Sequence, residues 1–492
     1  MGLRQYICNS NLKIIRSLFI FYLLCLSGLV LAQSDTASVK KNKVRPIFIP
    51  IADFEAFNIK TKAMDTSLDM LSQLNPFRKT NMAYQDLGLI GTAIQPLSLN
   101  TLKKTGFDLG FNTMNTWMFQ NGSNERIIVA PTPYTMIHYS QGAKDLIFLN
   151  ILHTQNITKR WNAGIDFRRL KTNNYLFFNL SGDAYNKIRI PSTYNVKLFT
   201  SYHTKRDKYY LLGSLTSNKI RQRETGGLTD PIAFDTTSGR RRVFDNPLSN
   251  ATNFINQRAL FFSHYLRFGK TSYQTILKDS TKLDTISFDF RPRGFFYHTL
   301  NASSSKFYYK DPNYDTLFYP KPIFGDTTSD SLVLREVTNA VGIVLKASYK
   351  QFRNVLKMGA EISNYGIYNV YTKQDNTYNL SLNGSLLMAL TGKKNEIELI
   401  GKGQYFIAGY NSGDYMLNAA GKILIEDRIR LSGSISSQRH VADYFQSVAT
   451  TNHLIWNQKL TPTLRNGIDA SVEWLPMRIN AGFNISNFQH ST

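Results

Sequence analysis

The sequence is poor in cysteine and in long apolar stretches, and both shortages restrict what the chain can be. Only Cys8 and Cys25 occur among the 492 residues, and both lie in the first 32. If that stretch is removed on export, a disulfide framework, a cysteine-ligated metal and a thiol nucleophile are all excluded. After Ala32, no stretch approaches the roughly 18 consecutive apolar residues that a membrane-spanning helix requires.

Sequence motifs for catalysis and nucleotide binding are also missing. There is no G-x-S-x-G turn, P-loop, dinucleotide fingerprint or H-E-x-x-H pair. We expect His264 and His298 to lie on strand faces rather than to bind metal, and we predict no enzymatic activity, no cofactor and no metal. A lipid-facing catalytic site drawn from Ser363, Asn364 and His440 stays open as an alternative, although a chain rich in serine and asparagine offers such sets by composition alone.

Residues 1–32 have the pattern of a secretory signal peptide. The stretch holds three basic residues and no acid, namely Arg4, Lys13 and Arg16. An apolar run covers residues 17–31, and Val30-Leu31-Ala32 fits a cleavage site, so we expect the mature chain to begin at Gln33. A retained membrane anchor is the alternative, although the apolar run is short for a membrane span.

From about residue 105 onward, apolar side chains recur with a period of two. Residues 161–168, 356–363 and 479–486 alternate in this way. A strand sorts such residues onto two faces, whereas a helix would spread them around its circumference. We count about 16–18 such runs, each near the length of a tilted membrane strand. The predicted fold class is therefore all-β, an antiparallel up-and-down transmembrane β-barrel, with a soluble β-sandwich as the alternative.

The connections between these runs alternate in length, as in a barrel whose periplasmic turns are short. Tight turns are expected at 350–354, 391–395, 426–427 and 461–463, and longer links near 371–376, 409–413 and 439–450. The tight Leu475-Pro476 step breaks this alternation.

The predicted organisation has three parts. They are the signal peptide 1–32, a mature N-terminal segment 33–104, and an outer-membrane β-barrel 105–492. Residues 46–80 have mixed polarity and fit either a small periplasmic element or a piece inserted into the barrel lumen.

The two faces of the strands predict two sets of residues. With about 16 strands or more, side chains cannot fill the interior, so a water-filled or plugged lumen is expected. The candidate lumen-lining residues are Asp166, Arg168, Lys197, His203, Lys357, Glu361 and Arg430. Apolar faces end repeatedly in aromatic residues, as the girdles at the membrane interfaces would require. The candidate interface aromatics are Trp117, Trp161, Tyr349, Tyr405 and Trp474.

Acidic residues are scarce, since 34 Asp and Glu stand against 58 Lys and Arg, for a formal charge of +24. Much of the excess falls in predicted loops such as 205–208 and 240–242, where it would meet phosphates of outer-membrane lipid and lipopolysaccharide. A modestly basic lumen predicts only a weak preference for anions. Nucleic acid is not an expected partner, because no basic helix or stripe appears and the chain is exported.

Five short elements between residues 65 and 230 follow one another in a distinctive order. They are Asn75-Pro76, then Tyr84, Leu87, Gly88 and Gly91, then Tyr134-Thr135, then His153-Thr154-Gln155-Asn156, then Trp161-Asn162 with Gly164. Over this range the sequence resembles the Putative porin family of Gram-negative outer membranes. The resemblance implies an outer-membrane barrel of unassigned substrate and brings no catalytic residue.

The predicted function is passive diffusion of small hydrophilic solutes through the outer membrane. A plugged barrel that takes up a hydrophobic ligand, or that serves a secretion or assembly complex, is the alternative. The barrel-assembly machinery reads a terminal aromatic residue, whereas this chain ends at Thr492 with Phe488 nearby. Either Phe488 serves as that signal, or the barrel is incomplete at its C-terminus. A homo-oligomer is left open.

Overall fold

The computed structural model describes most of the chain from residue 47 onward. The described ranges are 47–57, 62–63, 84–86, 94–96, 104–110, 125–130, 132–142, 146–172, 192–224, 226, 248, 250–279, 282–312, 318–349, 351–372 and 374–490. Side chains are described throughout these ranges except at 62–63, 84–86, 94–96, 273–289 and 490. The predicted signal peptide and its cleavage site lie outside the described residues.

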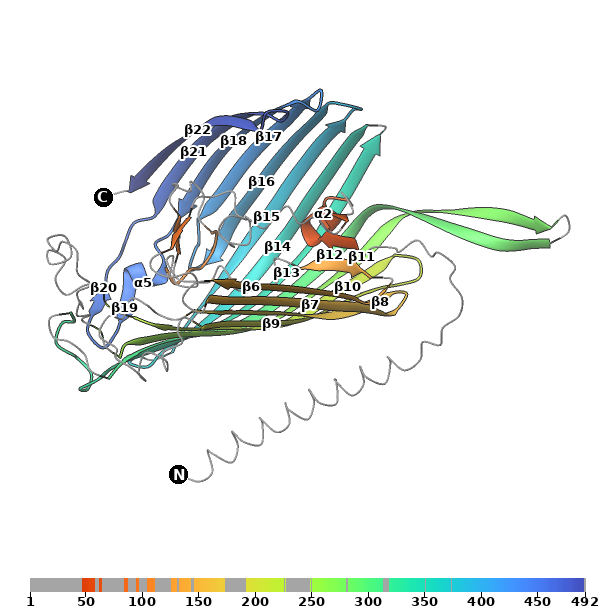
Figure 1. The fold of residues 1–492 in the computed structure, drawn as a ribbon. Helices are drawn as coiled ribbons and strands as arrows, with labels where there is room; N and C mark the ends of the chain where they lie inside the picture. The colour runs from red at the N-terminus through yellow and green to blue at the C-terminus, as the bar shows by residue number, and fades with distance from the viewer. Residues whose placement is uncertain are drawn as a thin grey trace, which may run out of the picture. The chain divides into compact units, whose positions relative to one another are not determined.

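One antiparallel sheet of 15 strands dominates the structure (Figure 1), and its strands pair with their neighbours in chain order from β6 to β22. The strands are β6 (Tyr134–Gly142), β7 (Leu146–Thr158), β8 (Trp161–Lys171), β9 (Ser192–His203), β10 (Tyr209–Arg223), β11 (Thr252–Asp279), β12 (Lys282–Asp311), β13 (Thr328–Tyr349), β14 (Phe352–Asn369), β15 (Asp375–Thr391), β16 (Glu396–Gly409), β17 (Tyr415–Ile425), β18 (Ile429–His440), β21 (Thr463–Trp474) and β22 (Ile479–His490). The predicted all-β, antiparallel up-and-down arrangement is confirmed.

The strands are longer than the sequence suggested. β13 has 22 residues, β14 has 18 and β15 has 17. Long strands use more chain each, so the described sheet contains 15 strands where 16–18 runs were expected. The alternating stretches 161–168, 356–363 and 479–486 lie within β8, β14 and β22.

Short turns recur at one end of the sheet, whereas the connections at the other end range from the three residues between β6 and β7 to the long connection between β18 and β21. Turns of a few residues join β7 to β8, β9 to β10, β13 to β14, β15 to β16, β17 to β18 and β21 to β22. The prediction of a tight turn at 461–463 is wrong, because residues 441–462 form one long connection between β18 and β21. The Leu475-Pro476 step therefore falls at the short-turn end, and the apparent break in the alternation disappears.

Shorter elements lie before and between the strands of this sheet. The helix α2 (Ile51–Glu55) follows β1 (Ile47–Pro50), which pairs with β2 (Lys62–Ala63) and β5 (Arg126–Val129) in a small sheet. Two further strands, β3 (Tyr84–Asp86) and β4 (Ile94–Pro96), pair with each other. The helix α5 (Tyr444–Ser447) and the hairpin of β19 (Val448–Thr450) and β20 (Ile455–Asn457) lie in the long connection after β18.

One hairpin extends beyond its neighbours at the short-turn end. β10 pairs with β11 only as far as Leu266, and β13 pairs with β12 only from Gly294. Residues 269–279 and 282–292 therefore pair only with each other, and Figure 1 shows this hairpin reaching past the ends of the adjacent strands.

Within the described residues, no helix is long and apolar enough to cross a membrane.

Candidate functional site

The register gives the large sheet one apolar face, which we call the outer face. Ile435 of β18 lies opposite Ile468 of β21, and Ile468 lies opposite Ile485 of β22. All three are exposed, Ile435 to 63%. Soluble monomers rarely expose apolar surface that runs from strand to strand, whereas a membrane strand must present it to lipid.

Four of the five predicted interface aromatics lie on this outer face. Trp161, Tyr349 and Trp474 each stand beside a short turn, and Tyr349 is 71% exposed. Tyr405 lies opposite Tyr415, beside the connection between β16 and β17 at the other end of the strands. Aromatic residues thus occur near both ends of the strands. Trp117 lies outside the described residues.

The opposite face, which we call the inner face, carries all seven candidate lumen residues. They are Asp166, Arg168, Lys197, His203, Lys357, Glu361 and Arg430, and each belongs to a strand of the large sheet. Asp166 lies directly opposite Lys197 across β8 and β9, and Arg430 lies opposite Glu473 across β18 and β21. Of the remaining members, Arg168 lies on β8 with Asp166, His203 lies on β9 with Lys197, and Lys357 and Glu361 both lie on β14.

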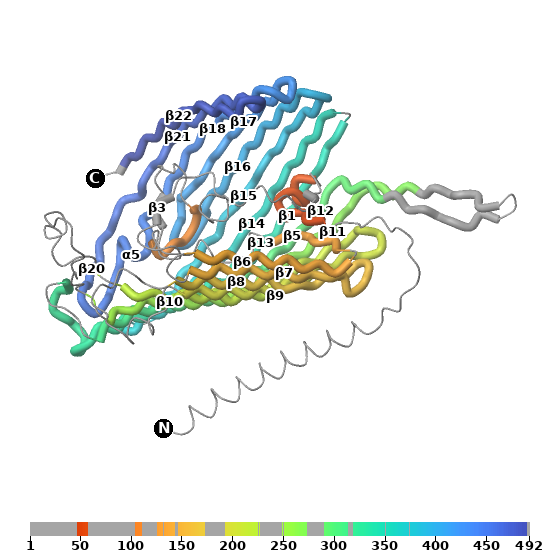
Figure 2. Tube along the Cα trace, viewed as in Figure 1, coloured from red at the N-terminus to blue at the C-terminus, as the bar shows by residue number. Residues whose placement is uncertain are grey.

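Part of the chain that precedes the sheet packs on this inner face. We call residues 47–57, 104–110 and 125–130 together the inner segment. Figure 2 traces β1 and β5 alongside β12 and β13, and side-chain contacts with β10–β14 tie these pieces to the sheet. Residues 47–57 belong to the stretch for which a lumen position was one of two expectations.

Glu125 of the inner segment forms a buried ion pair with the sheet. Its Oε1 lies 2.6 Å from Lys197 Nζ and accepts a 2.5 Å hydrogen bond from Ser214 Oγ. Glu125 is 6% exposed and Lys197 is 7% exposed. Two charges this deeply buried are costly unless they remain paired, so the contact resists separation.

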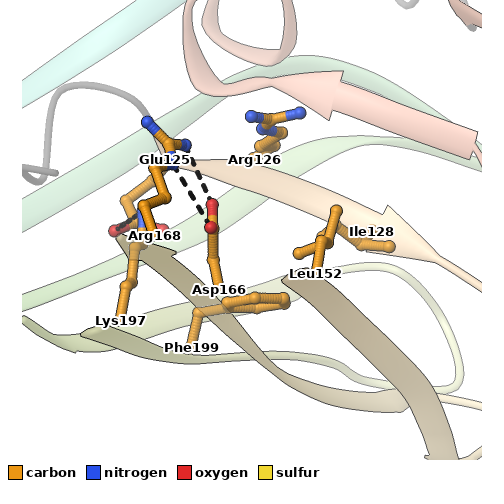
Figure 3. A pocket seen from close by; sticks show the side chains of 8 residues that line it. All are labelled: Glu125, Arg126, Ile128, Leu152, Asp166, Arg168, Lys197 and Phe199. Atoms are coloured by element: carbon orange, nitrogen blue, oxygen red, sulfur yellow. Dashed lines mark hydrogen bonds and ion pairs between the residues drawn. The ribbon is translucent and has the colours of Figure 1, made fainter. Parts of the chain in front are cut away.

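Further charges surround this pair (Figure 3). Arg168 Nη2 lies 2.9 Å from Asp166 Oδ2, so this arginine turns toward its own strand rather than toward Glu125. Arg126 comes from the inner segment, and Ile128, Leu152 and Phe199 close the apolar side of the small cavity. The cluster therefore holds two acids and three bases at the junction of segment and sheet.

A second ion pair fixes the helix α2. Glu55 Oε2 lies 2.6 Å from Lys357 Nζ, and Glu55 Oε1 accepts a 3.3 Å hydrogen bond from the Tyr265 hydroxyl. Lys357 also lies 4.7 Å from the centre of the Tyr297 ring. Lys197 and Lys357, both predicted from sequence to face the lumen, are thus neutralised by carboxylates of the inner segment.

Aromatic packing accompanies these ion pairs. The Phe54 ring lies 5.0 Å from that of Tyr210, 5.2 Å from Tyr265 and 5.8 Å from Phe295, centre to centre. Phe54 is buried in a cluster that also contains Ile127 of β5. Burying such side chains stabilises the docked segment by about 1.5–3 kcal/mol each.

Residues 104–110 dock farther along the same face. The Phe107 ring stacks on Tyr365 of β14 at 4.6 Å and meets Tyr410 edge-on at 5.1 Å. Thr105 Oγ1 donates a 2.6 Å hydrogen bond to Gln404 Oε1 of β16. The inner segment therefore contacts strands from β6, where the Phe48 ring meets that of Tyr134, to β16.

Beyond this footprint the inner face is open and carries both polar and apolar side chains. A cavity of about 440 Å³ lies between α2 and strands β14–β17, and Lys357, Asn383, Lys402 and Gln404 are among its lining residues. Farther along, a second cavity of about 570 Å³ is bounded by strands β17 to β22. This part of the face offers hydroxyl, amide and ammonium groups to water.

The other predicted residues make local contacts. His203 Nδ1 lies 2.7 Å from Asp207 Oδ1 in the β9–β10 turn, and this hydrogen bond lowers the pKa of the Asp207 carboxyl. Glu361 accepts a 3.5 Å hydrogen bond from Ser363 Oγ. Arg430 pairs with Glu473, and both side chains keep substantial exposure.

The residues of the alternative catalytic set are not brought together. Ser363 and Asn364 are consecutive in β14 and so point to opposite faces, and Ser363 bonds to Thr338 at 2.9 Å. His440 lies at the end of β18, where its Nε2 is 3.1 Å from Asp443 Oδ1. No group of three or more His, Cys, Asp or Glu residues suited to a metal occurs in the part of the chain that the structure describes.

Sequence reasoning missed the two residues that hold the inner segment, Glu55 and Glu125. Neither belongs to a recognisable motif. The strands that receive the segment did carry a recognisable sequence pattern. Phe261-Phe262 in β11 and Phe295-Phe296-Tyr297 in β12 are consecutive apolar residues. Such runs are typical of strands covered on both faces, and they mark the place where the segment docks.

Comparison with known proteins gives a family and distant structural neighbours. Residues 52–492 match the family described as Putative porin. No curated protein matches the chain. Three similar solved structures are the pyoverdine-bound FpvA of P. aeruginosa (10% identity, TM-score 0.46), the siderophore receptor PirA of Acinetobacter baumannii (11%, 0.44) and the ferric-catecholate import receptor Fiu of E. coli (10%, 0.44). They cover 80%, 75% and 73% of this chain, which in turn spans 55%, 55% and 58% of theirs.

Proposed function

Because the chain belongs to the Putative porin family, we propose that it is an outer-membrane channel whose own inner segment restricts the passage of small hydrophilic solutes. The family assignment and the antiparallel sheet support a β-barrel protein of the outer membrane with a transport role rather than an enzymatic one. Passive diffusion and the restriction by the inner segment are the parts of this proposal that an experiment must decide.

One observation carries the proposal, namely the division of the inner face into a filled and an open part. The inner segment fills the face of β10–β14 with an aromatic cluster, whereas the cavity beside it stays open and is lined by polar groups such as Asn383, Lys402 and Gln404 together with apolar ones such as Leu387, Ile400 and Met416. A water-filled path lined by hydroxyl and amide groups suits hydrophilic solutes, and its width sets the size limit. In this proposal the segment narrows the path without sealing it.

A second function is favoured by the ion pairs themselves. Glu125 with Lys197 and Glu55 with Lys357 hold the segment at two separate places. A segment held so firmly could seal the lumen at rest and move only during uptake of a particular ligand. This second proposal predicts a closed channel until the ion pairs are broken.

Planar-bilayer recordings of the full-length gene product, refolded in detergent, distinguish the two. We expect discrete, small conductance steps from the native protein. The double variant Glu55→Gln with Glu125→Gln keeps both side-chain shapes but removes both charges, so the segment loosens and we expect larger or longer openings. The matched control is Glu473→Gln, which breaks the Arg430 pair on the same face without touching the segment.

The recordings have three informative outcomes. Small native steps that grow in the double variant, but not in Glu473→Gln, support the restricted channel. A silent native protein whose double variant conducts favours the sealed uptake barrel. Native steps that the double variant leaves unchanged would contradict any role of the inner segment in limiting passage.

Finer features follow from the same proposal. Lys402 and Lys422 line the two open cavities of the inner face, and although Glu398 lies opposite Lys422 in the register, no ion pair to either lysine is found among the described residues, so we propose a weak preference for anions. A salt gradient across the bilayer tests this through the sign of the reversal potential. Contacts with lipopolysaccharide, insertion by the barrel-assembly machinery, cleavage after Ala32 and self-association are proposed on sequence grounds.

A further inference from the structure

A cavity of about 330 Å³ lies between the inner face of the large sheet and the long connection that follows β18. We call it the aromatic cavity. Strands β11–β14 form one wall, to which Phe307, Tyr309 and Leu332 contribute, and Phe445 and Trp456 of the connection form the other. Packed interiors leave few voids larger than a water molecule, so a space of this size has room for a small ligand.

Hydrogen bonds hold the connection over the sheet. The Asn452 N–H donates a 2.7 Å hydrogen bond to Asp330 Oδ1, and Asn452 Nδ2 donates one of 3.0 Å to the Thr327 carbonyl. Asn369 Nδ2 of β14 donates a 2.8 Å hydrogen bond to the Thr450 carbonyl. Asn452 is fully buried. The two walls of the aromatic cavity are therefore fixed relative to each other before any ligand enters.

Four rings and a single acid give the aromatic cavity its chemistry. The rings are those of Phe307, Tyr309, Phe445 and Trp456. The indole N–H of Trp456 already donates a 2.9 Å hydrogen bond to the Phe445 carbonyl, so the indole offers a ligand its π system rather than a donor. Asp330 is the one charged residue among the described lining residues, and no Lys or Arg is among them. Aromatic rings and a carboxylate both attract a cation.

The other polar groups of the lining are engaged within the protein. Besides its bond to Thr450, Asn369 accepts a 2.9 Å hydrogen bond from the Tyr371 N–H. Thr451 Oγ1 donates a 3.2 Å hydrogen bond to the Leu454 carbonyl. A sugar or another polyhydroxylated ligand needs several available donors and acceptors, which these side chains do not offer. The lining instead suits a compact apolar body with one positive charge.

We propose that the aromatic cavity binds a small organic cation, an aromatic or alkyl body that carries one ammonium group. The ammonium lies beside Asp330, and the body packs among the four rings. The site adjoins the inner segment, because the Phe445 N–H donates a 3.2 Å hydrogen bond to the Leu109 carbonyl. It is separate from the two open cavities of the inner face, so the inference does not rest on the proposed channel.

Photo-labelling of the full chain in an uncharged detergent tests this site. Three probes share one body and differ in charge, namely neutral benzophenone, protonated 4-(aminomethyl)benzophenone and anionic 4-benzoylbenzoate. Light couples each bound probe to nearby C–H bonds, and mass spectrometry of the peptides locates the adduct. We expect the cation to label peptides that contain residues 307–309 and 445–456 at the lowest concentration, the neutral probe next, and the anion last.

Two substitutions separate the charge from the rings. Asp330→Asn keeps an oxygen that can accept from the Asn452 N–H but removes the charge. It should raise the half-saturating concentration of the cation about tenfold and leave that of the neutral probe unchanged. Trp456→Leu keeps an apolar wall without the ring and should weaken binding of the cation at least about threefold. The matched control is Trp474→Leu, because Trp474 of β21 is 47% exposed on the outer face, and it should leave the labelling unchanged.

Labelling by the cation that Asp330→Asn and Trp456→Leu both weaken, while Trp474→Leu does not, supports the site. Equal labelling by the three probes, or adducts spread over the strands that neither cavity variant alters, would overturn it. Retained heat-modified gel mobility shows that each variant is folded, so loss of labelling reports the aromatic cavity. Because labelling requires no transport, this result stands separately from the conductance recordings.

Discussion

The two halves of the large sheet share one outer face but differ inside. Between β8 and β14 the inner face is covered by aromatic packing and by two ion pairs to the inner segment. Between β15 and β22 it keeps serine, asparagine, glutamine and lysine side chains, and its cavities stay open. Contact with lipid requires every membrane strand to carry an apolar outer face. The inner face has no such requirement, so it can either dock another segment of the chain or line a path for solutes.

The largest expected effect on the difference between the two halves comes from Phe54→Ala. The change removes the ring at the centre of the cluster formed with Tyr210, Tyr265 and Phe295. Truncation of a buried phenylalanine typically costs about 3–5 kcal/mol, so the segment should detach while the sheet persists. Limited proteolysis should then cut near residues 47–57 at least tenfold faster than in the native protein.

The matched control is Phe483→Ala in β22, whose ring is 58% exposed on the outer face of the other half. It should leave cleavage of the segment unchanged. Equal protease sensitivity of Phe54→Ala and the native chain would show that the cluster does not hold the segment in place.

A second contrast sets the buried pair of the first half against an exposed pair of the second. Glu125→Gln leaves Lys197 buried without its counter-charge, and breaking such a pair costs about 3–5 kcal/mol, less where water reaches the lumen. Glu473→Gln breaks the Arg430 pair, whose side chains are 43% and 32% exposed, and such pairs are worth about 0–1 kcal/mol.

Urea denaturation in lipid vesicles measures both changes. The expectation is a large fall in unfolding free energy for Glu125→Gln and a small one for Glu473→Gln. The additional replacement Lys197→Met should recover much of the loss, because it removes the orphaned charge. If the two single variants lose equal stability, burial is not what distinguishes the two pairs.

Much of this contrast could be foreseen from the sequence, and part of it could not. Alternation in residues such as 479–486 predicted the strands and both faces, because period two follows directly from strand geometry. It also placed Lys197 and Lys357 on the inner side. Their partners Glu125 and Glu55 lie 72 and 302 residues away along the chain, and periodicity carries no information about such distant contacts.

The turns showed a similar limit. The run Thr461 to Thr463 has the composition of a tight turn, yet it ends a long connection that also contains α5, β19 and β20. Turn chemistry reports local backbone preference, and tertiary packing decides which strands a turn joins. The tight step at Leu475-Pro476 was recognised from the sequence, but that it belongs to the short-turn end of the sheet was clear only once the pairing was known.

The smallest expected effect is a difference in the pH dependence of stability between a connection in the first half and a connection in the second half. In the first half, His203 lowers the pKa of Asp207, so its stabilisation is present above the unfolded value of about 3.9 and is lost as pH falls below it. In the second half, burial raises the pKa of Asp414, despite hydrogen bonds from the Val441 amide and Asn411. A raised carboxyl pKa means that the folded state binds the proton more tightly, so stability falls as pH rises through the interval above 3.9.

Hydrogen exchange of peptides covering the two connections, corrected for intrinsic rates, should therefore move in opposite directions between about pH 6 and pH 3. The β16–β17 connection gains protection as Asp414 takes up its proton, and the β9–β10 turn loses protection as Asp207 does. Asp414→Asn and Asp207→Asn should each flatten only their own profile. Parallel profiles at both sites would mean that neither carboxyl controls its connection, because a global change in the sheet would then account for both.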